Sequence, residues 1–139
     1  MELLSEYDLP ITIHCSEPVG HLYPGKGATT PNLLETFVKR FSKNKIIMAH
    51  WGGGLPFYEL MPEIKYLFKN VLYDTAASPL LYNKDIFNFI TKMLGPEKIL
   101  FGSDFPLISP NKIINQIDES DLIPEEKQLI FFENLLTLI

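Results

Sequence analysis

Hydrophobic positions along the chain follow two patterns, short continuous runs of strand formers and longer stretches with helical spacing. The continuous runs are residues 9–15, 46–49, 71–75 and 98–104. The stretches with helical spacing are residues 1–7, 31–41, 57–68, 86–94, 110–117 and 124–139. Because the two kinds alternate, the pattern predicts an α/β fold with parallel strands and right-handed crossovers.

Proline and glycine mark where several of the helical stretches begin and end. Pro31 can begin the second stretch, since proline suits the first helical turn. Gly95 can end the fourth. Pro62 lies inside the third and should kink or divide it.

The stretch that organises the chain is residues 45–57, KIIMAHWGGGLPF. Residues 46–49 present no polar side chain, which predicts a strand buried on both faces. His50 follows at the carboxyl end of this strand, and the three glycines after it allow a sharp exit from the sheet. In α/β proteins, ligands and catalytic groups collect at the carboxyl ends of strands. His50 is therefore the first candidate for a functional residue.

The composition fits one domain over residues 1–139. With 46% hydrophobic residues, the chain can build one core. A net charge of -5, from 12 basic and 17 acidic residues, argues against nucleic acid as a partner. No apolar run approaches the roughly 18 residues of a membrane span, and a single cysteine, Cys15, suits a reducing compartment. We therefore expect a cytoplasmic protein with no membrane partner.

Each of the four strand runs ends at or beside a residue that can carry chemistry. These residues are His14, His50, Asp74 and Asp104. Parallel strands bring their carboxyl ends to one edge of a sheet, so the four side chains should lie near one another. For Asp74, a role in capping the loop that follows its strand is at least as good an explanation as a functional one.

His14, His50 and Asp104 together form a ligand set for a divalent metal, most simply zinc, with an open position for water. A bound zinc would lower the pKa of that water towards roughly 7, and a histidine that is not a ligand could act as a general base. Each residue taken alone is better explained as structural, a hydrogen-bonded histidine or an aspartate that stabilises a turn. Their matched positions in successive strand units favour a site.

Three further residues are candidates for substrate binding: His21, Lys26 and Trp51. His21 lies in the long loop after the first strand, where a solvated histidine is the alternative. Residues 20–26, GHLYPGK, have the glycine and lysine spacing of a phosphate-binding loop. However, Gly27 stands where that motif needs serine or threonine, so we reject a nucleotide site. Lys26 could still bind a substrate carboxylate or phosphate as a point charge.

Three motifs together resemble those of the amidohydrolase-related, metal-dependent hydrolases and decarboxylases, which are (β/α)8 TIM barrels. They are PITIHCSE with its loop HLYPGKG, then IIMAHWGGGLPF, and KILFGSDFPL. The resemblance implies that the chain corresponds to barrel strands five to eight, the carboxyl-terminal half. It also implies that His14 is a metal ligand, that His50 orients or deprotonates the attacking water, and that Asp104 is a metal ligand and proton shuttle.

The chain departs from this family in lacking the His-x-His pair of the first barrel strand. A metal would therefore keep only His14 and Asp104 of its usual protein ligands, unless His50 or another chain contributes. Half a barrel also leaves sheet edges open and an apolar face uncovered. We therefore expect a homo-oligomer or pairing with the missing amino-terminal half-barrel. The side chains expected on the uncovered face are Ile13, Ile47, Met48, Leu72 and Leu100.

The function expected from the resemblance is hydrolysis of a C–N or C–O bond, or non-oxidative decarboxylation, of a small molecule through a metal-activated water. The alternative is a non-catalytic, truncated remnant that serves as an assembly or binding module.

Overall fold

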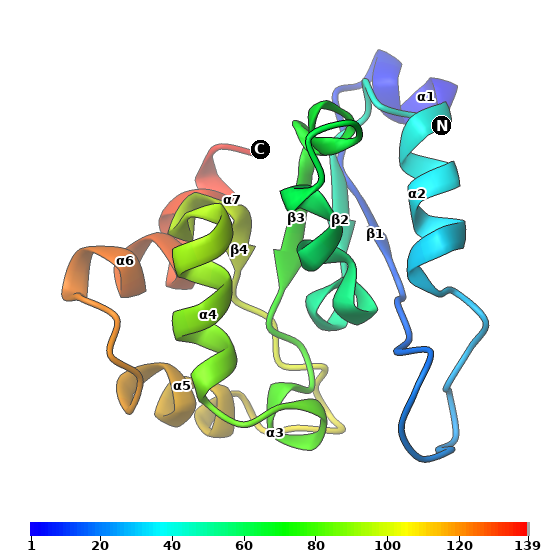
Figure 1. Ribbon diagram of the computed structural model, residues 1–139. Coiled ribbons are helices and arrows are strands. Elements are labelled where there is room, and N and C mark those ends of the chain that lie inside the picture. Colours follow the sequence, from blue (N-terminus) through cyan, green and yellow to red (C-terminus); the bar gives the residue numbers. More distant parts are fainter. Residues whose placement is uncertain (139) are drawn as a thin grey trace.

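The computed structural model describes residues 1–138, and its centre is one parallel sheet (Figure 1). The strands follow the chain in the order β1-β2-β3-β4. They are β1 (Ile11–Ile13), β2 (Ile46–Met48), β3 (Val71–Asp74) and β4 (Ile99–Leu100). Each strand pairs in parallel with the next, which confirms the predicted α/β fold and its sequential topology.

Helical segments precede the first strand, fill the connections between the strands and follow the last strand. Those up to β4 are α1 (Glu2–Glu6), α2 (Pro31–Arg40), η1 (His50–Leu60), η2 (Lys65–Phe68), α3 (Ser78–Leu81), α4 (Asp85–Leu94) and η3 (Pro96–Lys98). Those after β4 are α5 (Pro110–Asp118), α6 (Pro124–Gln128), the π-helical turn η4 (Leu129–Glu133) and α7 (Asn134–Leu136). Pro31 begins α2 and Gly95 ends α4, as predicted. Pro62 lies in the break between the 3-10 helices η1 and η2, which confirms the predicted division.

One face of the sheet is sealed by α2, η1 and η2. The core on this side combines strand residues with Leu34 and Val38 of α2, Leu55 of η1, and Leu67 and Phe68 of η2. Because side chains alternate along a strand, β2 sends Ile46 and Met48 to this side, and both are fully buried. We predicted that Met48 and Ile13 would lie on an uncovered face. This was wrong, because both pack on the helix side.

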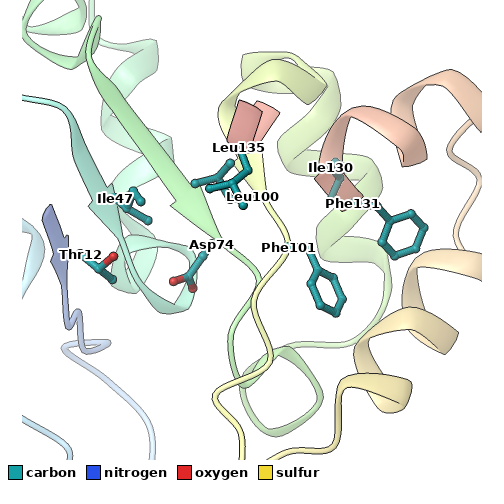
Figure 2. A pocket seen from close by; sticks show the side chains of 8 residues that line it. All are labelled: Thr12, Ile47, Asp74, Leu100, Phe101, Ile130, Phe131 and Leu135. Atoms are coloured by element: carbon teal, nitrogen blue, oxygen red, sulfur yellow. The ribbon is translucent and has the colours of Figure 1, made fainter. Parts of the chain in front are cut away.

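The other face of the sheet is only partly covered. Ile47, Leu72 and Leu100 point to this side and meet Leu138 from the end of the described chain. This coverage buries Ile47 and Leu100, which we had expected to be exposed, while Leu72 stays half-buried. A hollow of about 160 Å³ remains between the sheet and the carboxyl-terminal helices (Figure 2). Its lining residues are Thr12, Ile47, Asp74, Leu100, Phe101, Ile130, Phe131 and Leu135.

Hydrogen bonds hold the carboxyl-terminal segment in this place. The amide of Asn134, itself buried, donates to the carbonyl oxygens of Pro96 at 2.7 Å and Ile99 at 2.8 Å. The Lys45 ammonium donates to the carbonyl oxygen of Leu138 at 3.0 Å. These bonds fix the carboxyl-terminal segment to parts of the chain that are distant from it in sequence.

A buried polar network lies on the helix side. The Tyr73 hydroxyl donates to Glu59 Oε1 at 2.7 Å, and Lys98 Nζ lies 3.4 Å from Glu59 Oε2. The same ammonium donates to the carbonyl oxygens of Phe68 and Val71. Burial raises the pKa of the Glu59 carboxyl and lowers the pKa of Lys98, although each charge favours the other. The network joins η1 to β3 and to η3, the helical turn that precedes β4.

No helix within residues 1–138 is long and apolar enough to cross a membrane.

Candidate active site

His14, His50 and Asp104 line one hollow of about 440 Å³ at the carboxyl edge of the sheet. The rings of His14 and His50 meet edge to face, with their centroids 4.9 Å apart. Asp104 enters from the segment after β4, in a left-handed backbone conformation with φ of 65°. The structure therefore brings together the three residues that the strand pattern places at one edge.

His50 begins a left-handed turn that carries the chain away from β2. Residues 50–54 all have positive φ, from 56° at His50 to 93° at Gly54. Two of the glycines in this turn allow close packing. A Cβ at Gly52 would lie 2.7 Å from the Tyr73 ring, and a Cβ at Gly53 would lie 2.6 Å from the Ser16 carbonyl oxygen. The turn thus packs directly against the chain that leaves β1 beside His14.

The imidazole of His50 is buried and held in one orientation. Its Nδ1 lies 3.1 Å from the carbonyl oxygen of Ala76. Because a carbonyl can only accept, Nδ1 carries the hydrogen, and Nε2 of the neutral ring keeps its lone pair. Among the hydrogen bonds of residues 1–138, none engages this Nε2, so it is the nitrogen available to a proton or a ligand.

His14 is held through its other nitrogen. Nε2 of His14 lies 3.1 Å from the Ser16 hydroxyl, which also accepts a hydrogen bond from the amide of Gly27 at 3.0 Å. Ser16 is fully buried, so it fixes the ring to the loop that returns from residue 27. No hydrogen bond within the described chain engages Nδ1 of His14, which leaves that nitrogen for a ligand.

Asp74 has the capping role considered for it, and it also contacts His50. Its Oδ1 accepts from the backbone amide of Ala76 at 3.0 Å and from that of His50 at 2.9 Å. Burial raises the pKa of the Asp74 carboxyl, while the two amide hydrogen bonds and His50 act in the opposite direction.

Of the predicted substrate-binding residues, His21 lines the hollow with Tyr23, whereas Lys26 and Trp51 do not. The Lys26 ammonium instead donates to the carbonyl oxygens of Val19 at 2.6 Å and His21 at 3.2 Å, and so closes its own loop. This geometry does not support a substrate contact for Lys26.

Trp51 is a core residue, which corrects its assignment to substrate binding. Its side chain is 1% exposed and packs edge to face on Phe87, with ring centroids 5.1 Å apart. Its indole nitrogen donates to the Ser78 hydroxyl at 2.6 Å. The left-handed turn rotates Trp51 away from the hollow that its neighbour His50 lines.

Sequence reasoning missed the apolar wall of the hollow and the serine that holds His14. The wall comes from the segment around α3 and from the loop after Asp104, as Ala77, Leu80, Leu81 and Leu107. Neither segment carries a motif, and leucines near a short helix give no signal of a binding surface. Ser16, two residues after His14, could have been found by asking what orients that ring.

The described residues 1–138 do not by themselves form a complete metal site. Within residues 1–138, no group of three or more histidine, cysteine, aspartate or glutamate side chains lies close enough to hold an ion. Two ring nitrogens and a carboxylate around one hollow suit a divalent cation chemically. A cation bound there would need ligands in addition to these three side chains as they are placed.

Comparison with protein families decides the relationship. A family model described as Amidohydrolase matches residues 1–134. The chain belongs to the Amidohydrolase family. The resemblance that the three motifs indicated is therefore confirmed, and the matched residues include His14, His50 and Asp104.

Solved structures of decarboxylases share the fold of this amidohydrolase chain. They include 5-carboxyvanillate decarboxylase from Sphingomonas paucimobilis, with TM-score 0.75 and 17% identity over 99% of this chain and 51% of that one. A dihydroxybenzoic acid decarboxylase from Polaromonas, with bound manganese and the inhibitor 2-nitroresorcinol, has TM-score 0.71 and 17% identity over 99% and 51%. A 2,6-dihydroxybenzoate decarboxylase from Rhizobium has TM-score 0.71 and 16% identity, over 97% of this chain and 52% of that one.

The chain spans about half the length of these solved relatives, and its four strands correspond to about half of the amidohydrolase barrel. A search of curated proteins found no match.

Proposed function

We propose that this amidohydrolase chain carries part of an active site that uses an activated water to hydrolyse a C–N or C–O bond, or that decarboxylates a small aromatic acid. The observation that carries the proposal is the convergence of His14, His50 and Asp104 on one hollow. The decarboxylases that share the fold support the second reaction class.

The residues of the hollow divide into a polar side and an apolar side. In the neutral ring of His50, Nδ1–H donates to Ala76 and Nε2 carries the lone pair, so Nε2 can accept a proton from a water or a substrate. The exposed Asp104 carboxylate can carry a proton between water and the reacting atom. Leu80, Leu81 and Leu107 offer a wall against which a flat ring can lie. In this arrangement, a substrate ring would be held with its polar group towards the histidines.

A divalent metal is the proposed cofactor. As the resemblance implies, His14 and the Asp104 carboxylate are the groups of this chain that would hold it, and Nδ1 is the His14 nitrogen without a hydrogen-bond partner within residues 1–138. Bound there, a divalent cation would supply Lewis acidity and lower the pKa of a coordinated water. Manganese in the Polaromonas relative supports a divalent ion, and the choice between manganese and zinc belongs to the experiment below.

The proposed partner is a half-barrel that pairs with β1 and β4 and supplies the missing ligands. The absence of a three-residue metal group within residues 1–138 supports this, because a working site would need donors from elsewhere. It also favours the second candidate function, a non-catalytic remnant that serves as an assembly or binding module.

Histidine NMR on the whole chain tests the proposed site, because the sequence has only three histidines. Titration with Mn²⁺ should broaden the ring signals of His14 and His50 before that of His21. His14→Gln should abolish the selective broadening at His50, whereas the control His21→Gln should leave it intact. Equal broadening of all three rings, or none at millimolar Mn²⁺, would count against a metal site and favour the non-catalytic alternative.

Calorimetry with Zn²⁺ and Mn²⁺ gives the strength of binding. With two usual ligands absent, the chain should bind either ion weakly and release little CO2 from 2,6-dihydroxybenzoate. Loss of two ligands should cost several of the roughly 10–16 kcal/mol that a complete zinc site provides. Stoichiometric zinc at nanomolar affinity in a monomer would contradict the half-site.

A further inference from the structure

The side chain of Asp74 does more than cap the loop after β3. Its Oδ1 accepts hydrogen bonds from two backbone amides that belong to different strand units, His50 after β2 and Ala76 after β3. The carbonyl of that same Ala76 accepts from the His50 ring. One carboxylate oxygen therefore fixes the backbone of His50 and, through residue 76, the direction of its imidazole.

The backbone conformation of His50 explains what the hydrogen bond to Asp74 does. His50 has φ of 56°, a left-handed conformation that non-glycine residues rarely adopt. The hydrogen bond from the backbone amide of His50 to Asp74 is made at the first residue of the left-handed turn, where the chain leaves the direction of β2. An acceptor at this point holds the turn in register with the end of β3.

We propose that Asp74 is a positioning residue for His50, which keeps the ring in the Nδ1-protonated form with Nε2 towards the hollow. The relevance for catalysis rests on the proposed function, since it assumes that Nε2 of His50 is used. The positioning itself needs neither metal nor substrate. The positioning role of Asp74 and the proposed function can therefore be disproved separately.

The test reads the ring nitrogens of His50 directly, by ¹H–¹⁵N correlation on the full chain without added metal. His50→Gln assigns the signal. The native protein should show His50 as the Nδ1–H tautomer. Asp74→Ala should convert the ring to the Nε2–H form or to a mixture, because Ala76 then loses its fixed place.

A matched control separates positioning from general loosening of the strand end. Thr75 is adjacent, fully buried, and also ties two segments: its hydroxyl donates to the Gly102 carbonyl at 2.8 Å and accepts from the Gly102 amide at 3.0 Å. Thr75→Val removes both bonds and leaves the contacts of His50 in place. It should therefore leave the tautomer unchanged.

Asp74→Asn keeps the experiment decisive if the alanine variant does not fold. The amide oxygen occupies the same place and should retain the Nδ1–H tautomer. Its hydrogen bonds lack charge, so amide exchange at His50 and Ala76 should accelerate by about five- to tenfold, with Gly102 unchanged. An unaltered tautomer in Asp74→Ala, an equal change in Thr75→Val, or unchanged exchange in Asp74→Asn would overturn the proposal.

Discussion

The two faces of the sheet are covered to different extents. On the helix side, Met48 and Tyr73 are fully buried under α2, η1 and η2. On the opposite side, Thr12 is exposed, Leu72 is half-buried, and a hollow lies between the strands and the carboxyl-terminal helices (Figure 2). The stability of the chain should therefore come mainly from the helix side, while the other side remains open to a partner.

The helix side of the sheet and its carboxyl edge also differ in whether their polar groups have hydrogen-bond partners. On the helix side, an ion pair and a tyrosine hydroxyl are buried with hydrogen-bonded partners. At the carboxyl edge, by contrast, Nε2 of His50 and Nδ1 of His14 have no hydrogen-bond partner within residues 1–138. Paired polar groups stabilise a fold, whereas unpaired ones at a hollow are available for chemistry.

Lys98→Met should have the largest effect, since it breaks the buried ion pair on the helix side. Glu59 would keep a buried charge with only the Tyr73 hydroxyl as a partner, which should cost about 3–5 kcal/mol of unfolding free energy. Urea unfolding followed by circular dichroism measures this. The exposed Lys65 beside the same network provides the control, and Lys65→Met should change stability by less than about 0.5 kcal/mol. Equal effects of the two substitutions would contradict the assigned role of Lys98.

A pair of truncations compares the two faces directly. Met48 and Leu72 lie on adjacent strands but point to opposite sides. Met48→Ala should destabilise by about 2–5 kcal/mol, because it leaves a cavity in a closed core. Leu72→Ala should cost only about 1 kcal/mol, since its side chain already meets solvent. If Leu72→Ala were the more destabilising, the open face would be better packed than described.

Thiol labelling compares the faces by accessibility. Cys15 is fully buried on the helix side, and burial raises the pKa of its thiol from 9.0 to about 12. It should therefore react slowly with iodoacetamide at pH 8, because the thiolate is the reactive form. Thr12→Cys, in the double variant with Cys15→Ala, places the thiol on the exposed side of β1, three residues before Cys15. That variant should react many times faster.

The raised pKa of the Cys15 thiol also predicts that the free energy of unfolding falls at alkaline pH. The folded state holds the proton up to about pH 12, whereas the unfolded chain releases it near pH 9. Its contribution is therefore complete below pH 9 and is lost as the pH rises towards 12. Urea midpoints between pH 8 and 11 should fall less in Cys15→Ala than in the native chain. A fall of equal size would mean that other groups dominate.

The fold was largely predictable because its signals are local. Strand runs, Pro31, Pro62 and Gly95 each act within a few residues of the boundary they set. The parallel order follows from strands alternating with helices. Which strand residues stay open was less predictable. Leu138 covers Ile47 and Leu100 from the far end of the chain, and no local pattern indicates that contact.

The site was predictable to the extent that it depends on strand ends. His14, His50 and Asp104 converge because parallel strands share an edge. Trp51 could not be placed correctly, since its direction is set by a left-handed turn whose geometry depends on packing against Tyr73. The hydrogen bonds of Ser16 and Asp74 likewise depend on contacts between loops that are distant in sequence.

The glycines after His50 set how much sequence variation this corner of the molecule can tolerate. At position 53 a side chain would collide with the backbone of the neighbouring strand end, which cannot swing aside as a flexible side chain could. At position 54 the backbone is also left-handed, yet nothing lies within 4 Å of a Cβ. In a saturation library selected for folding, position 53 should return glycine alone, while position 54 should also return asparagine and aspartate. The turn after β2 can thus pack against the chain that leaves β1 only because residue 53 has no Cβ atom.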